Sequence, residues 1–100
     1  MTNLVSAEII EYDYEVVNTY QHDKDAFTQG LLYKEGLLYE STGLKGDSSL
    51  RKIELKTEKI TNIKKINKKY FAEGITIFNN KIYQLTWQEN TAFVYDLNFN

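Results

Sequence analysis

The stretch FTQGLLY at residues 27–33 returns 44 residues later as FAEGITI at residues 71–77. Both copies begin with Phe, carry Gly at the fourth position and continue with apolar residues. The register holds further along, because Leu38-Tyr39-Glu40 aligns with Ile82-Tyr83-Gln84 at the same offset. A repeat of roughly 40–45 residues with about four short strands is typical of a β-propeller blade. Chance similarity of two hairpins is the alternative interpretation.

Runs of aromatic and β-branched residues, each of strand length, fill the spaces between turn-forming residues such as Lys34-Glu35-Gly36 and Asn79-Asn80. We therefore expect an all-β fold. The first blade, residues 27–66, would contain strands at 27–33, 36–42, 49–55 and 59–66. The second, residues 71–97, would contain three strands, at 71–78, 81–87 and 91–97. Residues 60–66 also carry Ile at helical spacing, but their β-branched residues and the repeat favour a strand.

Two blades do not close a ring, because propellers need about four or more. We therefore expect residues 1–100 to form one partial domain, an incomplete β-propeller that opens a longer protein. Residues 14–20 read as an orphan strand of the kind that closes a propeller ring. We expect Ile75, Ile77, Leu85 and Phe93 to share one core between the blades. The open blade faces predict marginal stability or self-association.

The composition fits an ordinary soluble domain, with 42% hydrophobic and 26% charged residues. No run approaches the roughly 20 apolar residues that a membrane-spanning helix needs, so no membrane partner is expected. The first 17 residues carry four acids and no basic residue, which does not match a secretory signal. With no Cys and a single His, the sequence predicts neither a disulfide framework nor a zinc site, and no cofactor.

The net charge of −2 conceals an asymmetry between the two halves of the chain. Residues 1–50 carry −6 and residues 51–100 carry +4, and eight of the basic residues lie between Arg51 and Lys69. A nucleic-acid-binding surface would interleave aromatic residues with these cations, and none occurs before Tyr70. We expect no nucleic-acid partner, and interpret the run as a solvated outer strand whose Lys residues protect the edge.

Five motifs occur in order along the chain: YQHDKDAFTQGL at 20–31, LYESTGL at 38–44, GDSSLR at 46–51, YFAEGIT at 70–76 and YQLTW at 83–87. Together they resemble the plant and bacterial type of glutaminyl-peptide cyclotransferase, the glutamine cyclotransferase family. The similarity covers roughly residues 14–97, in the N-terminal portion of the family. The family forms a five-bladed propeller, which implies roughly 200–225 residues at this repeat length.

The resemblance implies that an N-terminal glutamine of a peptide or protein is converted to pyroglutamate with release of ammonia. It matches Glu73 to the family's catalytic glutamate, a general acid/base. A carboxyl on an innermost strand beside Phe71 and Trp87 would be partly desolvated, which raises the pKa of a carboxyl toward the useful range. The residues alone favour a merely solvated glutamate in the channel wall.

The resemblance also matches Phe27, Gln29, Phe71 and Trp87 to substrate-pocket positions. Aromatic walls would shield a small amide side chain from water, and Gln29 could hydrogen-bond its polar end. An ordinary core role for the three aromatic residues is the alternative. His22-Asp23 invites interpretation as a catalytic dyad, but adjacent residues in an extended chain point to opposite faces, so we interpret the pair as turn structure.

Three departures limit this transfer. Gln21 stands where the family usually has Pro, Ala72 where it usually has Gly, and residues contributed by later blades have no counterpart before Asn100. We therefore expect this chain alone to be inactive. The alternative function is a noncatalytic propeller module that binds peptides. The resemblance is to the zinc-independent class, whose members are often exported, and it leaves localisation open.

Overall fold

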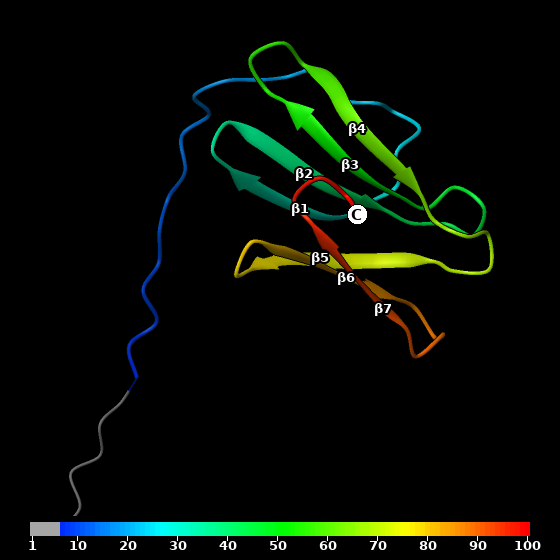
Figure 1. Cartoon of the computed structure of the whole chain (residues 1–100). Helices are drawn as coiled ribbons and strands as arrows, with labels where there is room; N and C mark the ends of the chain where they lie inside the picture. The colour runs from blue at the N-terminus through cyan, green and yellow to red at the C-terminus, as the bar shows by residue number, and fades with distance from the viewer. Residues whose placement is uncertain (1–6) are drawn as a thin grey trace, which may run out of the picture.

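Two consecutive antiparallel sheets make up the body of the computed structural model, which describes residues 7–100 (Figure 1). Sheet one has the strand order β1-β2-β3-β4, and sheet two has the order β5-β6-β7. Every strand pairs with its neighbour in sequence, so each sheet is a meander. The strands are β1 (Thr28–Lys34), β2 (Leu37–Thr42), β3 (Ser49–Glu54), β4 (Lys59–Lys65), β5 (Ala72–Phe78), β6 (Lys81–Thr86) and β7 (Ala92–Asp96).

Residues with positive φ make the tight turns of these meanders. Asn79 and Asn80 have φ values of 49° and 59°, the conformation that a two-residue hairpin of type I′ requires. Glu35 and Gly36 serve the same purpose between β1 and β2, at 52° and 81°. These turns confirm the predicted hairpins. The strands predicted for the two blades are confirmed to within one residue at each end, and residues 59–65 form β4 and not a helix, whereas the strand expected at residues 14–20 is absent.

The internal repeat is a repeat of structure as well as of sequence. In β1 the register shifts between Thr28 and Gly30, and in β5 it shifts between Ala72 and Ile75. Each shift is a β-bulge in the first strand of its sheet, at equivalent positions. The backbone N–H of Gly43 donates to the Phe27 carbonyl at 2.8 Å, and that of Trp87 donates to the Phe71 carbonyl at 2.8 Å, 44 positions later.

The sheets stack face to face around an apolar cluster built from both. Its buried members are Tyr39, Leu50, Ile66, Ala72, Ile82, Tyr95 and Phe99. Ile75, Ile77 and Phe93 pack against this cluster as predicted. The prediction for Leu85 is wrong. Leu85 pairs with Ala92 and alternates with the buried Gln84, so it points to the opposite face and is 55% exposed.

A buried polar network links the sheets beside the apolar cluster. The Gln84 side-chain amide donates to the Ser41 hydroxyl at 2.9 Å and to the Ser49 carbonyl at 3.2 Å, both in sheet one. The Tyr95 hydroxyl donates to the Gln84 carbonyl oxygen at 2.9 Å. Every polar atom of the Gln84 side chain therefore has a partner, as a fully buried amide requires.

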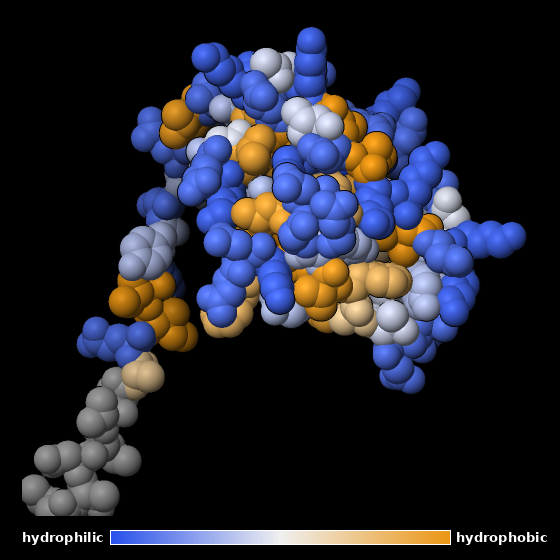
Figure 2. All heavy atoms as spheres, viewed as in Figure 1, coloured by the Kyte–Doolittle hydropathy of each residue, from blue (hydrophilic) through white to orange (hydrophobic). Residues whose placement is uncertain are grey.

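Residues 7–27 precede the sheets, and their N-terminal part extends away from them (Figure 1). Hydrophobic side chains lie along this extension (Figure 2). The side chains of Ile9, Tyr12, Tyr14 and Val17 are each more than 80% exposed. Residues 14–20 form no strand within the described chain, so their role in closing a ring stays a prediction. None of residues 7–100 belongs to a helix long and apolar enough to cross a membrane.

Candidate functional site

Three of the predicted pocket residues form one aromatic row at the ends of three strands. The Phe27 and Phe71 rings lie edge to face with centroids 6.1 Å apart, and the Phe71 and Trp87 rings follow at 5.6 Å. Phe27 and Phe71 precede β1 and β5, and Trp87 follows β6. Phe27 and Trp87 are each 48% exposed, so the outer rings of the row leave apolar surface open. The row thus joins residues from both sheets.

Gln29 joins this row through a close approach to Gly43. A methyl group on Gly43 would lie 2.9 Å from Cγ of Gln29 and 2.4 Å from Cε1 of Phe71. The absence of a side chain at Gly43 therefore lets both side chains pack against the backbone between β2 and β3. Gln29 itself occupies the bulge of β1, and bulges commonly redirect a side chain at the rim of a sheet.

Glu73 occupies the equivalent bulge in β5, between Ala72 and Ile75, and is half-buried. Its carboxylate makes no hydrogen bond or ion pair with residues 7–100. Both bulges lie next to the contact between β1 and β5, the inner strands of the two sheets. A Cβ on Gly30 would stand 2.8 Å from the backbone nitrogen of Ile75. Gln29 and Glu73 therefore occupy bulges at neighbouring points of the adjoining strands β1 and β5, and Gln29 packs at Gly43 together with Phe71.

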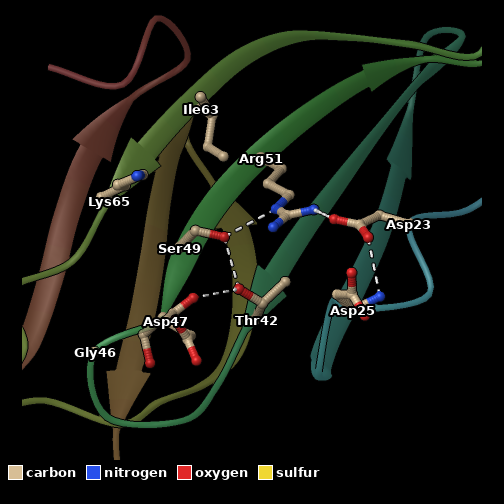
Figure 3. Close-up of a pocket in the computed structure, with 10 residues that line it drawn as sticks. Asp23, Asp25, Thr42, Gly46, Asp47, Ser49, Arg51, Ile63 and Lys65 are labelled. Carbon is tan, nitrogen blue, oxygen red and sulfur yellow. Dashed lines mark hydrogen bonds and ion pairs between the residues drawn. The ribbon is translucent and has the colours of Figure 1, made fainter.

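A hollow in the described surface lies away from these residues. It has a volume of about 300 Å³ and opens on the outer face of sheet one, the face turned away from sheet two (Figure 3). Its polar side chains bond to one another: Arg51 donates to Asp23 at 2.8 Å and to the Ser49 hydroxyl at 3.0 Å, and Ser49 lies 2.6 Å from the Thr42 hydroxyl. None of the predicted site residues lines this hollow.

Asp23 opens the turn before β1, as predicted, whereas His22 lies just ahead of this turn, and the two side chains have different partners. The backbone N–H of Ala26 donates to the Asp23 carbonyl at 3.1 Å, while the Asp23 carboxylate accepts from Arg51. His22 Nε2 lies 2.6 Å from Oε2 of Glu40, a fully buried carboxylate on β2. The structural role of Glu40 was not predicted from the sequence. The available signal was its alignment with Gln84, which places a polar residue mid-strand in both sheets.

Two ionisable groups show the electrostatic consequences of these contacts. The hydrogen bond from Arg51, with the amide of Asp25, holds the pKa of Asp23 below its usual 3.8. Burial between the sheets raises the pKa of Tyr95 from 10.0 to about 12. Within residues 7–100, no cluster of three or more His, Asp or Glu side chains is arranged to hold a metal ion.

Stacked antiparallel sheets with an aromatic row at their inner strands define a repeat-built all-β protein. Residues 2–99 match the glutamine cyclotransferase family, and the chain belongs to that family. The glutaminyl-peptide cyclotransferase of Arabidopsis thaliana is 49% identical over 86 residues, which cover 85% of this chain and 27% of that protein. The chain thus spans about a quarter of the length of this relative.

Proposed function

We propose that this chain contributes the opening part of a glutaminyl-peptide cyclotransferase, built as a five-bladed propeller with sheets one and two as its first blades. The aromatic row of Phe27, Phe71 and Trp87 carries the proposal, and the position of Glu73 in the β5 bulge, two residues after Phe71, supports it as the acid/base group. The substrate is a peptide or protein with N-terminal glutamine. Membership of the family and the relative's activity support this substrate.

In the proposed reaction, the α-amine attacks the side-chain amide carbon of the same glutamine. The new C–N bond closes a five-membered ring, and the former amide nitrogen leaves as ammonia. Holding the substrate folded supplies much of the rate, because ring closure is intramolecular. The proton lost by the attacking amine must reach the departing nitrogen. Glu73 takes the proton as a base and returns it as an acid, so that one carboxyl serves both transfers.

The other site residues bind and shield the substrate. Phe71 and Trp87 wall the reacting amide against water, Phe27 extends the wall, and Gln29 hydrogen-bonds the polar end of the substrate. The close packing of Phe71 and Gln29 on Gly43 supports this arrangement, because packing fixes their rotamers. The proposed chemistry uses no metal and no cofactor.

The test is ammonia release from a short glutamine-initiated peptide by a full-length protein that carries these residues. Glu73→Gln keeps the side-chain shape and should lower turnover by roughly two to four orders of magnitude, the usual scale of general acid–base catalysis. Peptide affinity should persist. Glu89→Gln, on the exposed turn before β7, is the matched control and should leave turnover unchanged.

Two further measurements separate this mechanism from its rivals. Trp87→Ala should weaken both binding and turnover, because it removes a wall that orients the substrate. A chelator should leave turnover unchanged, whereas a zinc-dependent cyclase would lose activity. Wild-type turnover in Glu73→Gln would remove Glu73 from the mechanism. Peptide binding without ammonia release in the unmodified protein would favour a noncatalytic peptide-binding module.

A further inference from the structure

Glu40 is a fully buried carboxylate whose bonding pattern calls for an explanation. Its Oε2 accepts from the Thr28 hydroxyl at 2.5 Å and lies 2.6 Å from Nε2 of His22. Its Oε1 is buried with no partner among the described residues. Burying a carboxylate is costly unless hydrogen bonds or opposite charge compensate it. A residue that only filled space on β2 would incur none of this cost.

Glu40 and its counterpart in sheet two bind to different parts of the chain. Glu40 and Gln84 occupy equivalent positions, opposite Leu31 in β1 and Ile75 in β5. Gln84 ties sheet two to the preceding sheet, and Glu40 ties sheet one to the segment that precedes it. The partner changes with it, because Thr28 supplies a hydroxyl where sheet two has Ala72.

The Thr28 hydroxyl connects Glu40 to the candidate site. Thr28 lies between Phe27 and Gln29, and the bulge that carries Gln29 begins at Thr28. The Phe27 carbonyl accepts the Gly43 amide one residue before the Thr28 contact. Fixing the Thr28 side chain on β2 therefore fixes the chain on both sides of it. His22, just before the turn that precedes β1, is the second partner of the Glu40 carboxylate. Arg51 holds this turn through its hydrogen bond to Asp23.

We propose that Glu40 is a positioning residue, which sets the orientation of Phe27 and Gln29 through the Thr28 hydroxyl. The contacts themselves do not depend on the reaction, but their consequence for substrate rests on the function proposed above. Glu40 acts on the first sheet only, because Ala72 offers no equivalent hydroxyl to Gln84. Removing the hydrogen bond between Thr28 and Glu40 should weaken the backbone hydrogen bond from Gly43 to Phe27. The equivalent backbone hydrogen bond from Trp87 to Phe71 should stay unchanged.

Amide hydrogen exchange of the isotopically labelled 100-residue chain tests this by NMR. Thr28→Val removes the hydroxyl and keeps the volume, and should lower the protection of the Gly43 amide by roughly tenfold or more, the scale of one hydrogen bond to a charged group. The Trp87 amide should change less than about twofold. Thr28→Ser restores the hydroxyl and should restore the protection. Thr76→Val, on the exposed face of β5, is the matched control.

Glu40→Leu is the second variant. It removes both acceptor oxygens and should displace the ring resonances of His22 as well as expose the Gly43 amide. If Glu40→Leu does not fold, Thr28→Val alone decides. Equal loss of protection at Gly43 and Trp87 would show general destabilisation and overturn the proposal. Full protection of Gly43 in Thr28→Val would overturn it too.

Binding of a glutamine-initiated tripeptide, monitored by the NMR signal of the Gln29 side-chain amide, tests whether the positioning by Glu40 affects substrate affinity. Thr28→Val should weaken its affinity by roughly tenfold, and Thr28→Ser should not. Unchanged affinity in Thr28→Val would overturn the effect on substrate. If the unmodified chain does not bind the tripeptide, the proposed site fails in this chain. The exchange of the Gly43 and Trp87 amides still decides the positioning role, so the two failures are distinguishable.

Discussion

Gly30 and Gly74 occupy equivalent positions in the repeat and differ in what surrounds them. A Cβ on Gly30 would stand 2.8 Å from the Ile75 backbone nitrogen, about 0.6 Å short of the 3.4 Å at which ordinary contact begins. The obstacle is backbone, so Gly30→Ala must push β1 and β5 apart. Overpacking of this kind costs about 1–3 kcal/mol. A Cβ on Gly74 meets nothing within 4 Å, so Gly74→Ala should be close to neutral.

Urea unfolding, followed by Trp87 fluorescence, measures both variants against the unmodified chain. Gly30→Ala should lower the unfolding midpoint with little change in the denaturant slope, because the native contacts weaken while the exposed surface stays similar. Gly74→Ala is the matched control, because it makes the same change in the backbone entropy of the unfolded chain without the steric contact. Equal midpoints for the two variants would refute the close contact between the inner strands, and with it the stacking of the sheets.

Two further predictions follow from the inter-sheet contacts. Tyr95 ionises near pH 10 when unfolded and near pH 12 when folded, so the folded state keeps the proton longer and loses stability as the pH rises through this window, by about 3 kcal/mol in all. Tyr95→Phe should flatten this alkaline dependence in unfolding experiments, and an unchanged profile would contradict burial of the hydroxyl. The open outer faces, with exposed Leu31 and Tyr33 on sheet one and Leu85 and Val94 on sheet two, should make the chain self-associate at micromolar concentration. A monomer in sedimentation at this concentration, with a cooperative unfolding transition, would contradict this.

The strands were predictable because their signals are local. Asn79-Asn80 marks a hairpin by its tolerance of positive φ, and the repeat carried the assignment of residues 59–65 as a strand against a helical spacing of Ile. The aromatic row was predictable for another reason. The offset of 44 residues brings Phe27 and Phe71 to equivalent strands, and stacking the sheets brings the strands together.

The positions that sequence reasoning missed depend on details of register. Leu85 was assigned to the core from its hydrophobicity, but Ile82 and Gln84 are the buried residues of β6, so alternation along the strand turns Leu85 to the opposite face. Glu40 was not identified because its partners Thr28 and His22 lie 12 and 18 residues away, and His22 comes from a segment without regular structure.

The buried amide of Gln84 has a consequence for the order in which the two sheets follow one another. Its nitrogen donates to the Ser49 carbonyl, an atom that accepts only, and its oxygen accepts from Tyr95. A carboxylate in its place would set like partial charges against each other, because an ionised carboxylate only accepts. Sheet one carries that carboxylate, Glu40, at the equivalent position. A second copy of sheet one therefore cannot replace sheet two. The direction of one hydrogen bond thus fixes the order of two otherwise similar repeats along the chain.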